Sequence, residues 1–212
     1  MNVQGLASLY ALLSGMLTLL IAMGNVQGDM IDTSGLKAWE TCAMCHGVDG
    51  VSHMDRFPKL AGQPLAYLTK QLRDFKLERR LNDNGTMTAM AGSKMMKTLQ
   101  QAAKYYSRLP PPPAFKRSPS AIDRNAQILF ENGDPRRNLP ACRSCHGTAA
   151  QFPRLKAQHE AYLAKQLLDF RGNARRNDPG GVMRKIAKIL SPKEIVDLAM
   201  YLAAQPRQKE VR

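Results

Sequence analysis

The sequence predicts an all-α protein built from two related helical domains in tandem. Apolar residues recur at three- and four-residue steps, as in Leu65, Leu68 and Leu72, which is the spacing of an amphipathic helix. Signals for β-strands are missing, and a long stretch of the first half is repeated in the second. The length of 212 residues suits two small domains, which we expect at residues 25–109 and 120–212.

The repeat identifies the chain as an internal duplication. "FPKLAGQPLAYLTKQLRDFKLERRLND", from Phe57, aligns without a gap with "FPRLKAQHEAYLAKQLLDFRGNARRND", from Phe152. The agreement extends to the last helix of each copy, where Tyr105 meets Tyr201. Identical pairs within the aligned stretch include Tyr67/Tyr162, Lys70/Lys165, Gln71/Gln166, Asp74/Asp169 and Phe75/Phe170.

Residues 1–24 precede the first copy and are predicted to be a signal peptide or an N-terminal membrane anchor. Leu6 to Met23 is an apolar run of 18 residues, and Ala22 and Gly24 are small enough to flank a cleavage site. No Lys or Arg precedes the run, and its length also suits a retained membrane anchor. Both alternatives imply export.

Residues 110–119 are predicted to be a stiff, proline-rich linker. The run Pro110 to Pro113 ends the preceding helix and favours an extended backbone. The last helix of the second copy has a strong start, with Ser191 as N-cap and Glu194 three residues later. The first copy has "SKMMK" there, so its last helix is expected to begin without such a cap.

All four cysteines belong to one pattern used twice, "CAMCHG" from Cys42 and "CRSCHG" from Cys142. A redox disulfide would need a βαβ context, which the sequence lacks. Structural zinc would need about four ligands, and His53 and His159 do not align as a fourth. The pattern Cys-x-x-Cys-His is typical of covalent haem attachment. We therefore expect haem c on Cys42, Cys45 and His46, and again on Cys142, Cys145 and His146.

The duplication also suggests the ligand on the opposite side of each iron. Met87 and Met183 are the only methionines that align with each other. Met90 remains an alternative, and His53 is a weaker one because it lies in a five-residue insertion. Three other methionines have no methionine counterpart: Met90, Met95 and Met96 face Ile186, Ser191 and Pro192.

Each histidine also needs an acceptor for its second ring N–H, to fix its orientation. Pro58 and Pro153 follow the two motifs and align, so their carbonyls are the candidates. The alternative is that the prolines only shape the loop.

These motifs and their flanks closely resemble the two halves of the diheme cytochrome c4 family, from about Leu36 to Gln205. The resemblance implies two class I cytochrome c domains related by pseudo-twofold symmetry, each wrapped on a covalent haem. It implies a periplasmic carrier of single electrons toward a terminal oxidase or another acceptor. The ligand sets it implies are Cys42, Cys45, His46 and Met87 for one haem, and Cys142, Cys145, His146 and Met183 for the other.

The charge bears on partners. The net charge is +14, and no nucleic-acid module is recognisable, so nucleic acid is not expected as a partner. Residues 25–113 hold 12 Lys/Arg and 8 Asp/Glu, a net +4, whereas residues 114–212 hold 19 and 9, a net +10. The second domain is therefore expected to dock redox proteins with an acidic face, including a membrane-bound oxidase or dehydrogenase.

Two rival functions differ in kind from a free carrier. One is a haem subunit of a larger membrane-bound oxidoreductase complex, held by an uncleaved N-terminal helix. The other is a diheme peroxidase, which needs an iron with an open site. The matching methionines argue against the peroxidase, and we expect no catalytic residue.

Overall fold

The computed structural model describes residues 35–118, 123–147 and 149–207, and the segment predicted to direct export lies outside them. Residues from Leu36 onward group into one compact unit. Within the described residues the regular structure is helical, with one isolated bridge between Asp134 and Leu139. In that part of the chain, no helix has the length and apolar character needed to cross a membrane.

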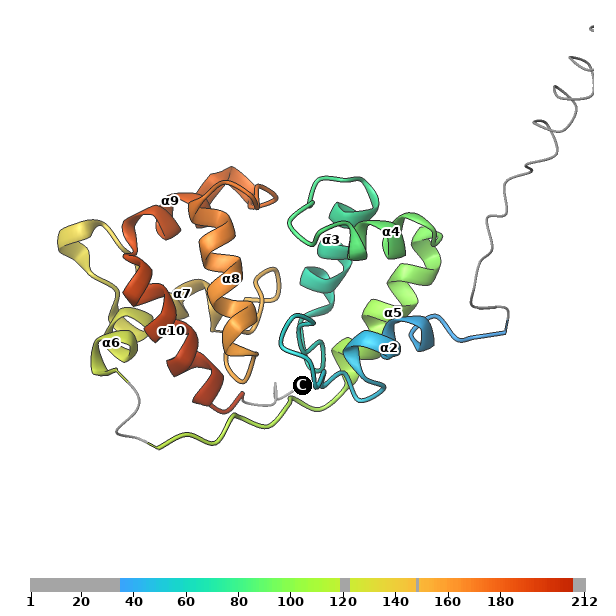
Figure 1. Ribbon diagram of the computed structural model, residues 1–212, viewed down its shortest axis with the longest axis horizontal. Coiled ribbons are helices and arrows are strands. Elements are labelled where there is room, and N and C mark those ends of the chain that lie inside the picture. Colours follow the sequence, from blue (N-terminus) through green and yellow to red (C-terminus); the bar gives the residue numbers. More distant parts are fainter. Residues whose placement is uncertain (1–34, 119–122, 148, 208–212) are drawn as a thin grey trace, which may run out of the picture. The chain divides into compact units, whose positions relative to one another are not determined.

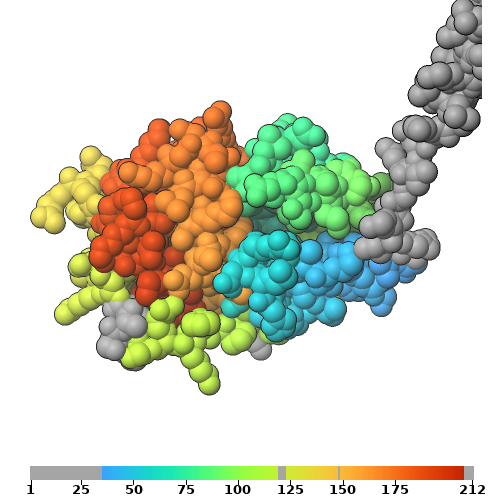
Figure 2. All heavy atoms as spheres, in the orientation of Figure 1, coloured from blue at the N-terminus to red at the C-terminus, as the bar shows by residue number. Residues whose placement is uncertain are grey.

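The helices form two similar sets along the chain, coloured blue to green and yellow to red (Figures 1 and 2). The first set is α2 (Glu40–His46), α3 (Leu65–Lys76), α4 (Thr86–Gly92) and α5 (Met96–Arg108). The second set is α6 (Arg124–Asn132), η2 (Pro135–Arg137), α7 (Arg143–His146), α8 (Glu160–Arg171), η3 (Pro179–Gly181), α9 (Val182–Ile189) and α10 (Pro192–Ala204).

Each set packs in the same way around one central helix. In the first, α3 packs against α4 and α5; in the second, α8 packs against α9 and α10, and α10 also covers α6. The duplicated Phe75 and Phe170 are both buried in these contacts. The prediction of two tandem all-α domains is confirmed, while the exact boundaries at 25–109 and 120–212 stay a prediction.

The segment between the two sets is extended and lies against the first domain. Residues 109–118 contain no helix. Gly62 has a φ of +64°, and a Cβ there would come within 3.3 Å of Pro111 Cα. The amide of Phe115 donates to the carbonyl of Ala203 at 3.0 Å. The proline run is thus held at both ends by backbone contacts.

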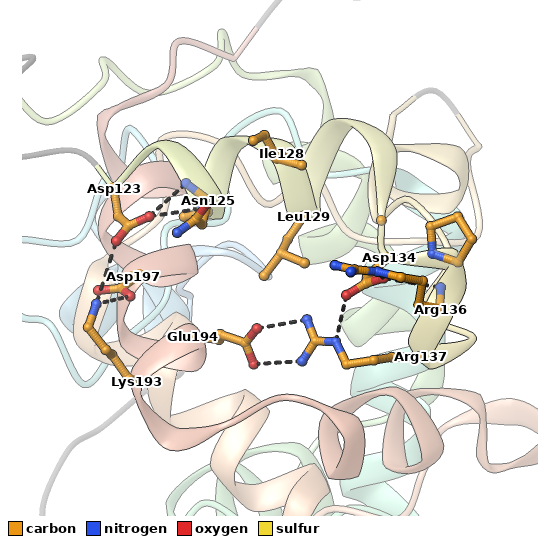
Figure 3. Close-up of a pocket in the computed structure, with 13 residues that line it drawn as sticks. Asp123, Asn125, Ile128, Leu129, Asp134, Arg136, Arg137, Lys193, Glu194 and Asp197 are labelled. Atoms are coloured by element: carbon orange, nitrogen blue, oxygen red, sulfur yellow. Dashed lines mark hydrogen bonds and ion pairs between the residues drawn. The ribbon is translucent and has the colours of Figure 1, made fainter.

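A cavity of about 630 Å³ lies between α6, η2 and the start of α10 (Figure 3). None of the predicted haem ligands lines it. Its floor is closed by Arg137, whose guanidinium bonds both carboxylate oxygens of Glu194, at 2.8 and 3.1 Å, and Asp134 at 2.8 Å. This ion-pair network joins the loop before the second Cys motif to α10.

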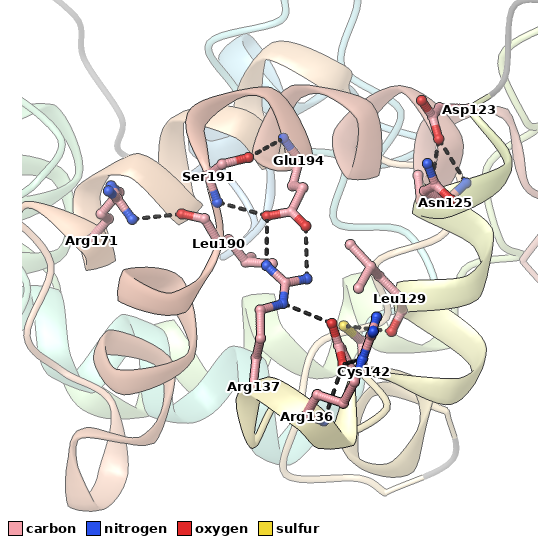
Figure 4. A network of polar contacts seen from close by, with 12 residues as sticks. Asp123, Asn125, Leu129, Arg136, Arg137, Cys142, Arg171, Leu190, Ser191 and Glu194 are labelled. Carbon is pink, nitrogen blue, oxygen red and sulfur yellow. Dashed lines mark hydrogen bonds and ion pairs between the residues drawn. The ribbon is translucent and has the colours of Figure 1, made fainter.

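The same Glu194 completes the start of α10 (Figure 4). The Ser191 hydroxyl accepts from the amide of Glu194 at 3.2 Å, and the Glu194 carboxylate accepts from the amide of Ser191 at 2.8 Å. This is the reciprocal capping box that the sequence predicts. The corresponding helix α5 begins after Met95 with no side-chain cap, which also agrees with the prediction.

The two domains meet through a buried polar network that repeats itself across the duplication. Gln71 Oε1 accepts from Arg80 at 2.7 Å, Arg175 at 2.9 Å and Asn177 at 3.0 Å. Gln166 Oε1 accepts from the mirror-related set, Arg175 at 2.8 Å, Arg80 at 2.9 Å and Asn82 at 3.0 Å. Each domain supplies the same residues to the other, which is the pattern of a pseudo-twofold axis.

A second pair of contacts follows the same symmetry. The side chain of Gln158 bonds the backbone N–H and C=O of Lys59 at 2.8 and 2.9 Å. The side chain of Gln63 bonds the backbone N–H and C=O of Arg154 at 2.9 and 2.8 Å. All four residues are buried, so these amides satisfy backbone groups that water does not reach.

Replacing Ser191 with Ala is expected to lower the free energy of unfolding by about 1 kcal/mol, because the first amides of α10 lose an acceptor. Urea unfolding of the haem-loaded protein measures this loss. The exposed Ser93, whose hydroxyl bonds only the carbonyl of Met90, provides the control. Ser93→Ala should change the free energy of unfolding by less than about 0.5 kcal/mol. Equal losses in the two variants would contradict the capping argument.

Replacing Gln71 with Leu should cost about 2–4 kcal/mol of unfolding free energy, because three buried donors lose their shared acceptor. Gln166→Leu should cost a similar amount, since its contacts mirror those of Gln71. The exposed Gln101 of α5 gives the matched control Gln101→Leu, for which we expect almost no change. Urea unfolding checks all three, and a harmless Gln71→Leu would mean that the network is dispensable.

Candidate functional site

Helix α2 carries the first Cys motif and ends on its histidine. Cys42 and Cys45 are free thiols about one turn apart, and His46 is the last residue of the helix. The His46 side chain is only 4% exposed. Its Nδ1 lies 2.9 Å from the carbonyl oxygen of Pro58, and Phe57 contacts the ring edge-on.

This contact fixes the tautomer of His46. A carbonyl only accepts hydrogen bonds, so Nδ1 must carry the proton and Nε2 keeps its lone pair. Burial lowers the pKa of His46, partly opposed by the bond to Pro58. The imidazole is therefore neutral at pH 7, which is the form that ligates a metal.

The second motif repeats this geometry on the short helix α7. His146 ends that helix, and its Nδ1 lies 3.0 Å from the carbonyl oxygen of Pro153. Burial likewise lowers the pKa of His146, and Phe152 packs beside the ring. Burial raises the pKa of Cys142 to about 11, so its thiol is protonated at neutral pH.

Met87 lies near the start of α4 and is held there by an aspartate. The Asp83 carboxylate accepts from the amides of Met87 and Thr88 and from the Thr88 hydroxyl. Met87 lines a small cavity together with Cys42 of α2 and Leu72 of α3. One predicted thioether donor and one predicted attachment thiol therefore face the same space.

The second copy places Met183 in the matching position, as the second residue of α9. Asp178, the counterpart of Asp83, bonds both the amide and the side chain of Arg184 at 3.0 and 2.9 Å. An aspartate thus anchors the methionine segment in each domain. The pairing of Met183 with His146 rests on the duplication.

The alternatives to Met87 separate by position. Met90 lines the same cavity as Met87 and remains an alternative. Met96 packs with the buried Phe75, Ala91 and Leu99. Met95 is largely exposed, and His53 lies in an exposed loop. The structure therefore leaves Met90 as the competitor.

The interdomain network holds residues whose role the sequence analysis missed. Arg80 and Arg175 are 5% and 6% exposed, and the side-chain acceptors described for both are neutral: amides and tyrosine hydroxyls. Desolvation and the nearby charge of Arg80 lower the pKa of Arg175. The available signal was that these residues recur at the same place in both copies, as "RRLND" and "RRND".

These donors fit a covalently attached haem c. Each motif offers two free thiols and a neutral histidine whose Nε2 is free, and each copy places a methionine near a helix start. Thiols can form thioether bonds, while imidazole and thioether are the axial pair of many c-type cytochromes. No cluster of three or more His, Cys, Asp or Glu suited to a metal ion occurs among the residues that the structure describes.

Comparison with known proteins identifies the family. The family model for cytochrome c matches residues 33–108. The chain is 41% identical over 177 residues to cytochrome c4 of Thiocapsa roseopersicina, covering 78% of this chain and 88% of that protein. It is 34% identical to a thiosulfate dehydrogenase electron acceptor of Stutzerimonas stutzeri, covering 90% and 93% of the two chains.

A solved structure agrees with the fold. The crystal structure of reduced cytochrome c4 from Pseudomonas stutzeri superimposes with a TM-score of 0.70 at 36% sequence identity, covering 78% of this chain and 93% of that one. Both domains of the chain therefore have a solved counterpart, and the helical architecture is that of tandem class I cytochromes. The chain belongs to the cytochrome c4 family, whose members carry electrons and are not enzymes.

Proposed function

We propose that the protein is a periplasmic diheme cytochrome that passes single electrons between respiratory donors and an acceptor such as a terminal oxidase. The observation that carries the proposal is the paired geometry of His46 and His146. Each follows a Cys-x-x-Cys pair, is buried and neutral, and donates from Nδ1 to the carbonyl of an aligned proline. Two such sites support two covalently attached haem c groups.

The residues divide the work at each site. Cys42 and Cys45, and likewise Cys142 and Cys145, would hold the ring through thioether bonds. His46 and Met87, and His146 and Met183, would occupy both axial positions, so that no substrate can reach the iron. Pro58 and Pro153 would keep each imidazole oriented and increase its basicity. When bound, haem c supplies a one-electron couple of relatively high potential.

Burial of the donors serves the same purpose. His46 is nearly inaccessible to water, and Met87 packs beside the buried residues Phe75, Ala91 and Leu99. A water-poor, rigid surrounding changes little when the charge of the site changes by one, so an electron can enter and leave without bond rearrangement. The apolar run Leu6 to Met23 supports export to the periplasm.

A second candidate function is electron acceptor of a specific dehydrogenase, either as a free protein or as a subunit of a larger complex. The similarity to a protein named thiosulfate dehydrogenase electron acceptor favours it, because that match spans nearly all of both chains. Co-purification of the tagged, full-length protein distinguishes the candidates. A stable dehydrogenase complex supports the subunit role, and a free protein of native mass supports the mobile carrier.

Replacing Met87 or Met183 with Ala is expected to open one iron each. Each variant should keep two covalent haems, lose about half of the weak far-red absorption of Met-ligated ferric haem, and show a lower potential at one haem. Absorption spectra and a redox titration measure this. Met90→Ala is the control and should leave both properties unchanged. A spectral loss in Met90→Ala instead of Met87→Ala would move the assignment to Met90.

The charge of the second domain predicts how it meets its partner. Electron transfer to a redox protein with an acidic contact face should slow at least tenfold when ionic strength rises from about 10 mM to about 300 mM. Charge reversal at the exposed Lys185 and Lys188 of α9 should slow it further at low salt. Lys104→Glu in the first domain is the control. A rate insensitive to salt would remove electrostatic docking from the proposal.

A further inference from the structure

The surfaces around the two Cys motifs differ more than the buried ligands do. In the first domain, Met44, between the two cysteines, is 58% exposed, and Val48, just after His46, is 63% exposed. Met95, which precedes α5, is 73% exposed. Soluble proteins rarely expose several large apolar side chains at one functional site without a use for them. We call these three residues the Met44 patch.

The Met44 patch lies on the segments that form the wall of the first site. Met44 belongs to α2, which ends on His46, and the carbonyl of Val48 accepts from the Tyr105 hydroxyl at 2.9 Å. Met95 follows Lys94, which lines the same cavity as Cys42 and Met87. In the space-filling view the blue segment that carries the first motif forms part of the protein surface (Figure 2).

The second domain has polar residues where the first has this patch. Ser144 stands at the position of Met44, Arg143 at that of Ala43, and Ser191 at that of Met95. Arg143 is largely exposed and pairs with Glu131 at 3.4 Å. Since the buried ligands are duplicated and these surface residues are not, the difference concerns what each site meets in solution.

The charges differ in the same sense. Residues 36–58 contain two basic and three acidic residues, a net charge of −1, whereas the aligned residues 136–153 contain three arginines and no acid, a net charge of +3. The ammonium of Lys94 brings the first site close to neutral. A neutral apolar surface gains nothing from a strongly acidic partner but buries readily against another apolar face.

We propose that the Met44 patch is the docking surface for a redox protein whose own contact face is apolar and nearly uncharged. This inference rests on the proposed carrier function. It assigns the two ends of electron transfer to different physics: apolar contact at the first domain and charge attraction at the second. A carrier built this way can keep its donor and its acceptor from competing for one face.

The test uses a blue-copper protein, with an uncharged apolar face around its copper, as the probe. One electron passes from Cu(I) of the probe to a ferric haem, giving Cu(II) and ferrous haem with no atom transferred. The bimolecular rate is measured by stopped flow for the haem-loaded full-length protein and for Met44→Ser/Met95→Ser. We expect the variant to react about tenfold more slowly, with the salt dependence of both rates below about twofold.

Two controls separate docking from damage. Val196→Ser removes an exposed apolar side chain of α10 and should leave the rate unchanged. Met95→Ser alone lies outside the Cys motif and places a good N-cap residue before α5, so it should fold normally and still slow the reaction. Haem content, spectra and potentials of each variant must match those of the parent protein.

The outcomes are distinct. An unchanged rate in Met44→Ser/Met95→Ser with intact haems overturns the docking proposal and leaves the carrier function standing. Missing haems or an open iron in the parent protein overturn the carrier function instead. Concentration-dependent dimerisation of the parent protein, abolished in the variant, would show that a second copy occupies the patch and would also overturn the proposal.

Discussion

The shared acceptor between the two domains is the contact on which the rest of the structure depends. Gln71 and Gln166 each receive three buried donors, two of them guanidinium groups from different domains. A buried charge is tolerated only when it is fully hydrogen bonded, so these contacts must form together or not at all. The central helices α3 and α8 carry the glutamines and also the core residues Phe75 and Phe170. The same helices therefore set both the internal packing of each domain and its place beside the other.

That arrangement explains how one chain can offer two similar interiors and two dissimilar exteriors. The buried part of each copy is under the same demands: a neutral histidine tied to a proline carbonyl, an aspartate that anchors the methionine segment, and a glutamine at the interface. The outer surface meets no such demand. It has become basic in the second domain and locally apolar in the first.

Local signals made much of this foreseeable from the sequence. The Cys motifs, the capping box at Ser191 and the uncapped start of α5 each depend on neighbouring residues alone. The interface network depends on residues about ninety positions apart, and its arginines and asparagines look like ordinary surface residues in a basic chain. The repeat did bring Gln71 and Gln166 into view, but identity in an alignment does not say that two residues touch each other. The exposure of Met44 and Met95 was equally out of reach, since an apolar residue in a sequence is expected to lie inside.

The interface has a history written into its symmetry. Every donor and acceptor on one domain finds its own equivalent on the other, as with Lys59/Arg154 and Gln158/Gln63. A face of this kind is complementary to itself, which is how two identical chains form a twofold dimer. A single ancestral copy could therefore pair with itself before any gene fusion, and the proline-rich connector then made the pairing independent of dilution. Since then, a change on one side of the axis has had to be matched by a change in the other half of the same gene.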